Sequence, residues 1–124
     1  MKSVLIVDDV KGWRDYNSNI VQELLEDVDI QTADCAQAAY DILLKQNPLD
    51  IIITDLQMET DFEPKYAGEW LIEQIRTFSC YKKTKIVIIS ASYNVRNIAE
   101  HYDVLCIPKS TALKCLSAYQ EALL

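Results

Sequence analysis

The sequence predicts an α/β protein built on a doubly wound, five-stranded parallel sheet. Three observations support this fold class. Five short apolar runs rich in β-branched residues recur along the chain, segments with helical spacing separate them, and several of the runs end directly in a chemically active polar residue. Unbroken apolar runs are typical of strands buried on both faces. Right-handed crossovers then place the intervening helices on both faces of the sheet.

The third apolar run is the centre of this pattern. Four residues of high β propensity, Ile51-Ile52-Ile53-Thr54, lead straight into Asp55. In open α/β sheets, ligands bind beyond the carboxyl ends of the strands, so Asp55 is placed where a carboxylate can take part in chemistry. In chain order, the five predicted strands are 3–7, about 30–33, 51–54, 85–89 and 104–107.

Five helices are expected between and after these strands, because apolar residues recur there at intervals of three and four. Asn47-Pro48 ends the second helix, and Ser110 is a suitable N-cap for the last one. The apolar stripes cover residues 13–28, 36–43, 68–78, 95–102 and 112–123.

Length and composition indicate one domain over residues 1–124. Half of the residues are hydrophobic, and with two Gly and three Pro no linker stands out. The net charge of −7 disfavours sequence-independent nucleic-acid binding, which needs a basic surface. We expect no membrane segment and no signal peptide, since the chain enters its first strand directly. The four cysteines form no C-x-x-C pair, which favours free thiols in a cytoplasmic protein.

Polar residues with reactive side chains follow four of the predicted strands. Asp8 and Asp9 follow the first, Asp55 the third, Ser90 ends the fourth, and Lys109 comes after the fifth. Carboxylates gathered at one edge repel, by ~4 kcal/mol for two charges ~4 Å apart at an effective dielectric near 20. A Mg²⁺ ion removes that penalty and prefers carboxylates, water and phosphate oxygens. A metal, an ammonium and a hydroxyl around one aspartate indicate phosphoryl transfer to that aspartate.

These residues resemble the receiver domain of two-component response regulators, the group that includes the chemotaxis receiver. The matching segments are Val7-Asp8-Asp9, Asp55-Leu56-Gln57-Met58, Ser90-Ala91 and Lys109, and the resemblance covers essentially the whole chain. It implies a flavodoxin-like sheet with strand order 2-1-3-4-5. It also implies a signalling protein that catalyses only its own phosphorylation and dephosphorylation.

The resemblance assigns a role to each residue of the acidic cluster. Asp55 corresponds to the phosphoacceptor, which receives a phosphoryl group from a histidine kinase or a histidine phosphotransfer protein. Asp9 corresponds to the direct Mg²⁺ ligand, and Asp8 to the acid that holds the ion through water. The backbone carbonyl of Gln57 corresponds to the main-chain Mg²⁺ ligand.

Residues after the last two strands correspond to those that sense the phosphoryl group. Ser90 matches the hydroxyl residue that turns toward it, and Lys109 the lysine that pairs with it. Gln57 and Ser92 fall where the family tunes the lifetime of the acyl phosphate. The resemblance further implies an unidentified downstream protein target.

Several positions depart from the family pattern. Glu59 stands where a proline is usual, and the acidic connection around residues 59–66 is several residues longer than usual. It either covers the site, offers a docking surface, or is an ordinary variable loop. Lys109 is normally followed by a proline joined through a cis bond, but Ser110 follows here, and a non-proline cis bond costs ~3 kcal/mol. Cys106 replaces the usual aromatic switch residue.

Each of these residues also has a purely structural interpretation. Asp8 and Asp9 could cap the first helix, although that explains one aspartate more easily than two. A single turn aspartate or surface lysine is commonplace, but chance must then place suitable residues at four strand ends. We interpret the aromatic residues of the first and third helices and the one histidine as packing or solvated side chains: Trp13, Tyr16, Trp70 and His101.

Other functions fit the sequence less well. A haloacid-dehalogenase-type phosphatase would need an acid two residues after Asp55, where Gln57 stands. A flavin binder would need a phosphate-cradling loop after the first strand, where Asp8 and Asp9 would repel the phosphate. The P-loop motif of nucleotide enzymes is missing. The strongest alternative is a receiver-like interaction module that works without phosphorylation.

Overall fold

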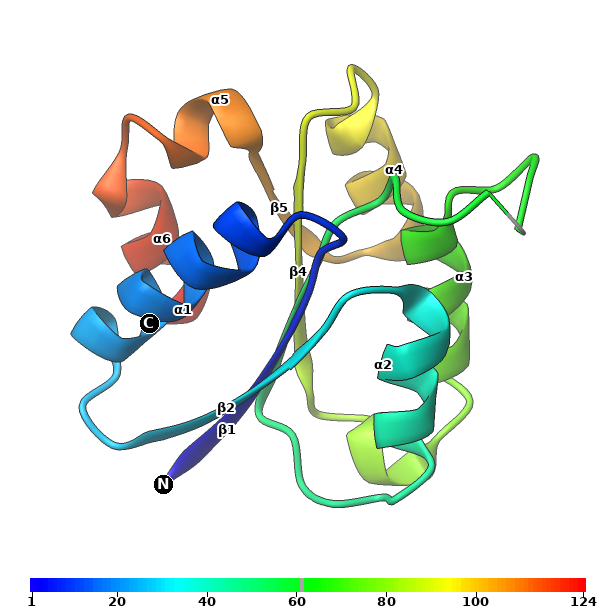
Figure 1. Cartoon of the computed structure of the whole chain (residues 1–124), viewed down its shortest axis with the longest axis horizontal. Coiled ribbons are helices and arrows are strands. Elements are labelled where there is room, and N and C mark those ends of the chain that lie inside the picture. Colours follow the sequence, from blue (N-terminus) through cyan, green and yellow to red (C-terminus); the bar gives the residue numbers. More distant parts are fainter. Residues whose placement is uncertain (61) are drawn as a thin grey trace.

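The computed structural model, which describes residues 1–60 and 62–124, contains one five-stranded sheet. Its strands lie in the order β2-β1-β3-β4-β5 and every neighbouring pair is parallel, which confirms the expected topology (Figure 1). The strands are β1 (Lys2–Val7), β2 (Val28–Ala33), β3 (Ile51–Thr54), β4 (Lys85–Ser90) and β5 (Leu105–Pro108).

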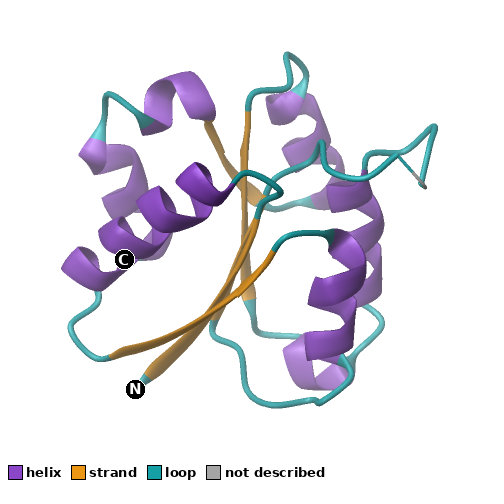
Figure 2. Cartoon of the chain, in the orientation of Figure 1, coloured by secondary structure: helices purple, strands orange, loops and turns teal. Residues whose placement is uncertain are grey.

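Helices cover both faces of the sheet, as a doubly wound fold requires. Figure 2 shows α1, α5 and α6 on one side of the strands and α2, α3 and α4 on the other. No helix of the described residues is both long and apolar enough to cross a membrane. The helices are α1 (Lys11–Leu24), α2 (Ala36–Leu43), α3 (Ala67–Ile75), α4 (Val95–Tyr102), α5 (Lys109–Ala112) and α6 (Leu116–Leu123), with a short 3-10 turn at Ser79–Tyr81.

The sheet divides the hydrophobic core into two layers. Successive residues of β1 alternate between them: Leu5 packs under α2 and α3, whereas Val4 and Ile6 pack under α1 and α6. All three side chains are 0% exposed. Full burial of such a side chain contributes ~1.5–3 kcal/mol, so both layers hold the strand ends in fixed positions.

The last helix differs from the prediction of a single segment. Pro108 is extended, with φ −60° and ψ 139°, and the short helix α5 begins immediately after it. Ser110 therefore lies inside α5 and is not an N-cap. Cys115 is extended, with φ −137° and ψ 93°, and separates α5 from α6. The described residues thus form six α-helices where five were expected, because the extended backbone at Cys115 interrupts the helix. Leu116, counted in the apolar stripe, is 47% exposed and does not face the core.

One boundary in the first half of the chain is also corrected. The apolar stripe suggested that the first helix extends to Val28, but α1 ends at Leu24. Val28 is instead the first residue of β2 and pairs with Lys2 of β1. The backbone of Leu25 is extended, with φ −116° and ψ 107°, so the chain leaves the helix there. Pairing with β1 gives the backbone groups of this segment their hydrogen-bond partners.

Candidate active site

The site lies at the carboxyl ends of β1 and β3, which are neighbours in the sheet. The backbone N–H of Asp55 donates to the carbonyl of Val7 at 3.0 Å, and that of Asp8 donates to the carbonyl of Ala33 at 3.1 Å. Both aspartates therefore continue the ladder of the sheet and inherit its rigidity. Asp8 is 1% and Asp55 5% exposed, whereas Asp9 faces solvent.

Three carboxylates meet at this edge, as the sequence predicted. One oxygen from each of Asp8, Asp9 and Asp55 lies within 4.8 Å of the others. The ligands of an octahedral Mg²⁺ ion, at 2.0–2.1 Å from the metal, lie about 3 to 4 Å apart. The three oxygens can reach that arrangement with small side-chain adjustments, so this donor set fits a hard divalent cation.

Lys109 joins the cluster from β5, across the intervening β4. Its Nζ lies 2.9 Å from Oδ2 of Asp55 and 3.1 Å from Oδ2 of Asp8, and its side chain is only 11% exposed. Burial opposes the charge of the ammonium, but the hydrogen bonds and charges of Asp55 and Asp8 outweigh it and raise the pKa of Lys109. Burial, assisted by the charge of Asp55, raises the pKa of Asp8 despite its bonds to Val10 and Lys109. Three carboxylates therefore share the Lys109 ammonium at this edge.

The Asp55 carboxylate has a fixed orientation. Its Oδ1 accepts a hydrogen bond from the backbone N–H of Leu56 at 2.7 Å, and its Oδ2 accepts one from Lys109 Nζ at 2.9 Å. One backbone donor and one charged donor therefore hold the two oxygens. Gln57 follows closely and is exposed; its carbonyl as a metal ligand stays a prediction.

Gly68 is a site residue whose importance the sequence did not reveal. Its backbone N–H donates to the carbonyl of Leu56 at 3.0 Å, which brings the start of α3 against the end of β3. A Cβ at this position would overlap the carbonyl oxygen of Asp55. The available signal was its scarcity, because Gly12 is the one other glycine in the chain.

Ser90 lies at the same edge, where its hydroxyl is engaged with Ser92. Its Oγ bonds the Oγ of Ser92 at 3.1 Å and accepts from the backbone N–H of Ser92 at 3.2 Å. Ser90, Ser92 and Lys109 line one cavity of about 300 Å³. The hydroxyl and the ammonium therefore border a common space beside the aspartate.

Trp13 packs against the core, as its helical spacing predicted, and it also belongs to the site. Its ring centroid lies 4.8 Å from Lys109 Nζ. Trp13 stands in the first turn of α1, four residues after Asp9, and so close to the edge of the sheet. That proximity in sequence was the signal that could have identified it.

The long connection from β3 to α3 lies against helices. Glu59 Oε1 accepts from the backbone N–H of Ala36 at 2.6 Å, at the start of α2. The ring of Phe62 stacks on Trp70 of α3 with 4.5 Å between centroids. Lys65 pairs with Glu73 at 2.7 Å. Asp61, which contributes to the acidity of this connection, lies outside the described residues.

The structure also describes the peptide bond after Lys109, the cysteines and the one histidine. Among the described residues, Glu63–Pro64 is the cis peptide bond, and the Lys109–Ser110 bond is trans. Cys106 is half-buried, and burial raises the pKa of its thiol. All four cysteines are free, as expected. His101 is exposed on α4 with its ring edge-on to Tyr102, in agreement with a solvated role.

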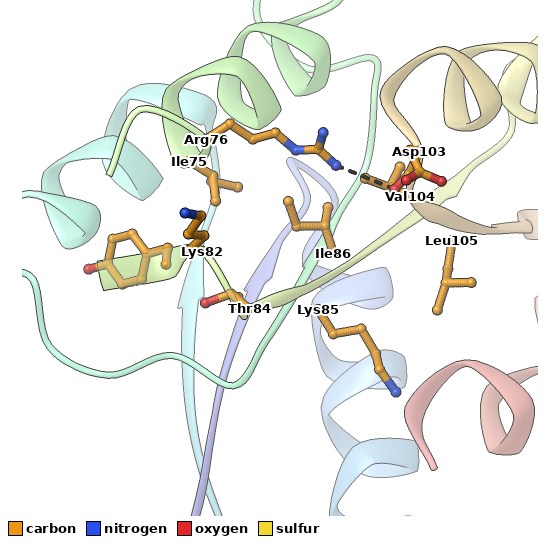
Figure 3. Close-up of a pocket in the computed structure, with 10 residues that line it drawn as sticks. Ile75, Arg76, Lys82, Thr84, Lys85, Ile86, Asp103, Val104 and Leu105 are labelled. Carbon is orange, nitrogen blue, oxygen red and sulfur yellow. Dashed lines mark hydrogen bonds between the residues drawn. The ribbon is translucent and has the colours of Figure 1, made fainter. Parts of the chain in front are cut away.

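A cavity larger than the one beside Ser90 lies at the opposite edge of the sheet, near the first residues of β4 and β5 (Figure 3). It measures about 470 Å³, and Arg76 bridges part of its rim by donating to the carbonyl of Asp103 at 3.3 Å. Arg76, Lys82 and Lys85 make its lining basic. It is remote from the carboxylate cluster, which remains the candidate for chemistry.

Comparison with known proteins agrees with this geometry. The model of the response regulator receiver domain matches residues 4–110. The chemotaxis response regulator CheY4 of Vibrio cholerae is similar in structure, with a TM-score of 0.74 at 22% identity over 99% of both chains. The regulator TrrA of Thermotoga maritima, solved with Mg²⁺ and BeF, has a TM-score of 0.75 at 25% identity over 100% of both chains.

The likeness to CheY4 supports the fold alone, since its identity is low. No curated protein sequence matches the chain. The family model spans most of the chain and includes Asp8, Asp55 and Lys109. Together with the flavodoxin-like strand order, this match shows that the chain belongs to the response regulator receiver domain family.

Proposed function

We propose that this receiver domain, residues 1–124, accepts a phosphoryl group on Asp55 in a two-component or phosphorelay pathway. The donor is the phosphohistidine of a histidine kinase or of a histidine phosphotransfer protein. The observation that carries the proposal is the position of Asp55: a buried carboxylate at the end of the central strand, 2.9 Å from the Lys109 ammonium and grouped with two further carboxylates.

The chain's own residues support the transfer in distinct ways. An Asp55 oxygen forms the new P–O bond while the P–N bond of the phosphohistidine breaks and the imidazole leaves. The Leu56 N–H holds one Asp55 oxygen at 2.7 Å and so restricts the direction of attack. The Lys109 ammonium lies where it can balance the charge of the phosphoryl oxygens, and such preorganised groups are the main source of catalysis in phosphoryl transfer.

We also propose that Asp8, Asp9 and Asp55, with the backbone carbonyl of Gln57, hold Mg²⁺. When bound, the ion neutralises negative charge on the phosphoryl oxygens. Support comes from the three carboxylate oxygens that converge at the edge of the sheet. The related TrrA structure, solved with Mg²⁺ and BeF, is in keeping with this assignment.

The phosphorylated form signals, in this proposal, by binding another protein in the cytoplasm. Ser90 and Lys109 border one cavity, so both can turn toward a phosphoryl group there. A contact to an ionised group contributes ~1.5–3 kcal/mol, comparable to a typical allosteric coupling of ~1–3 kcal/mol. The surface formed by α4, β5 and the helices after it can therefore respond without an aromatic residue at Cys106.

Amide NMR with and without Mg²⁺ and beryllofluoride tests this function. Chemical shifts should change at residues 95–107, the changes should vanish in Ser90→Ala, and they should survive in Cys106→Ala. Changes limited to the loops beside Asp55 would defeat this output route and favour one through residues 59–66. A spectrum with no change at all would favour the phosphorylation-independent interaction module, which Cys106 at the switch position and the unusual connection around residues 59–66 keep as the second candidate.

A further inference from the structure

The position of Lys109 needs an explanation within this chain. The residue begins the four-residue helix α5 through a trans bond to Ser110, and its side chain crosses β4 to reach Asp55. A lysine side chain has many rotamers and loses that freedom when it is held in one of them. Contacts beyond those to the aspartates would reduce this cost by limiting the directions that the ammonium can take.

Trp13 supplies one such contact. Its ring lies 4.8 Å from Lys109 Nζ, while Asp55 and Asp8 bind the same ammonium at 2.9 and 3.1 Å. The cation thus has carboxylates and an aromatic ring as neighbours, and only 11% of the lysine side chain remains exposed. Attraction between an ammonium and an indole ring is strongest among the aromatic residues and grows when the cation is shielded from water.

Tyr16, one turn further along α1, holds the backbone that carries the lysine. Its hydroxyl donates to the carbonyl of Ala112, the last residue of α5, at 2.9 Å. Its ring meets the ring of Trp13 edge-on, with 5.5 Å between centroids and 80° between planes. The same ring is edge-on to Tyr119, which is fully buried and donates to Asn17 Oδ1 at 2.6 Å. The aromatic pair is therefore anchored in the core.

We propose that Trp13 and Tyr16 are positioning residues for Lys109. Trp13 fixes the ammonium against Asp55, and Tyr16 fixes the short helix from which the lysine extends. The positioning itself is a property of the fold. Its effect on the rate of phosphorylation rests on the proposed function of Asp55.

The first measurement observes the lysine directly. Protons beside the face of an indole ring are shifted upfield, so the Lys109 Hε signals should lie upfield of those of an exposed lysine. Trp13→Leu should move them toward ordinary values, and Trp13→Phe should move them part of the way. Trp70→Phe is the matched control, because Trp70 packs against Tyr40 and Phe62, and it should leave the Lys109 signals unchanged.

The second measurement is the rate at which acetyl phosphate and Mg²⁺ add a phosphoryl mass. Trp13→Leu should slow it about tenfold, and Trp13→Phe should restore most of the rate because it keeps a ring face. Tyr16→Phe loses the hydroxyl alone and should slow labelling about threefold. Trp70→Phe should label at the wild-type rate.

The outcomes separate the inference from the proposed function. Wild-type Lys109 signals at ordinary positions, or wild-type labelling rates in both Trp13→Leu and Tyr16→Phe, would overturn the positioning role. Absence of labelling in the wild type would reject the function of Asp55, and the NMR shifts would still decide the positioning. If Trp13→Leu does not fold, Trp13→Phe and Tyr16→Phe carry the test.

Discussion

The acidic half of the site and its responding half differ in how they are built. The acidic half, at the ends of β1 and β3, consists of neighbouring strands whose aspartates continue the sheet ladder. The responding half, at the ends of β4 and β5, consists of Ser90, turned toward Ser92, and Lys109, held from a short helix. The aspartates of the acidic half match the family pattern, whereas the responding half carries the departures at Cys106 and Ser110.

This contrast separates the side chains that are positioned by their own strand from those that are positioned by other elements. The carboxylates are placed by the strands that precede them, so their convergence follows from parallel topology. The responding side chains are placed by contacts with other elements: Trp13 of α1 touches Lys109, and Tyr16 anchors α5. The acidic half should therefore tolerate little backbone change, and the responding half should be sensitive to residues that never touch the phosphoryl group.

The largest expected effect is on the rate of phosphorylation, when the lysine that links the two halves is replaced. Lys109→Met removes the cation that bridges Asp8 and Asp55, and loss of one preorganised charge-stabilising donor typically slows a reaction ~10²–10³-fold. Labelling by acetyl phosphate and Mg²⁺, followed by intact mass, measures the rate. Lys114→Met is the matched control, because Lys114 is exposed in the same region. Equal labelling rates in the two variants would show that Lys109 does not assist the phosphoryl transfer.

Metal binding should distinguish the members of the acidic half. Asp9→Ala should weaken Mg²⁺ binding at least ~10-fold, since loss of even a supporting partner of a metal ligand costs that much. Asp8→Ala should have the smaller effect, because Asp8 corresponds to the acid that acts through water. Trp13 fluorescence in a Trp70→Phe background, or calorimetry, measures the affinity. Unchanged affinity in Asp9→Ala would count against the site.

The close approach of Gly68 to the backbone of Asp55 should affect the free energy of unfolding. Gly68→Ala places a Cβ against the carbonyl of Asp55 and should destabilise the fold by ~1–3 kcal/mol, the usual cost of overpacking. Gly12→Ala is the matched control: Gly12 lies in α1 with no atom within 4 Å of an added Cβ, so it should be neutral or stabilising by up to ~1 kcal/mol. Urea unfolding measures both. A destabilised Gly12→Ala with an unaffected Gly68→Ala would reverse this interpretation.

The smallest expected effect concerns Glu73 of α3, which binds Lys65 of the β3–α3 connection and Tyr102 of α4. Hydrogen bonds from Lys65 and Tyr102 lower the pKa of Glu73 below its ordinary value of 4.5. Its folded pKa lies below its unfolded one, so its contribution to stability is present above pH 4.5 and is lost as the pH falls through the folded pKa.

Glu73→Gln should therefore cost no more than ~1 kcal/mol at pH 7, since solvent screens a side chain that is 35% exposed. The difference from wild type should shrink as the pH is lowered from 5 toward 3. Urea unfolding at several pH values measures it. A difference that grows toward acid would mean that Glu73 is not stabilised as a carboxylate.

The sequence predicted most of the architecture, because apolar runs and their spacing are local signals. It placed Asp8, Asp55 and Lys109 at one edge, since parallel strands share a direction. It did not reveal the break between α5 and α6, because Leu116 fits a helical stripe yet is exposed.

The contacts of Trp13 and Gly68 were missed for a related physical reason. A tryptophan in a helical stripe packs somewhere, but its partner is decided by the packing of α1 beside α5, which Tyr16 reaches with a hydrogen bond. A glycine near a helix start gives no sign of the backbone that approaches it. The docking of residues 59–66 likewise depends on the rings of Phe62 and Trp70, which meet only in the folded chain.

Intact mass after incubation with acetyl phosphate and Mg²⁺ tests the central claim, phosphorylation of Asp55, most directly. The wild type should gain the mass of one phosphoryl group, and Asp55→Asn should gain none, because the amide is no longer a nucleophile of this kind. Asp50→Asn is a suitable control, since Asp50 lies at the opposite end of β3 and should leave labelling intact. Equal labelling of Asp55→Asn and the wild type would contradict the account.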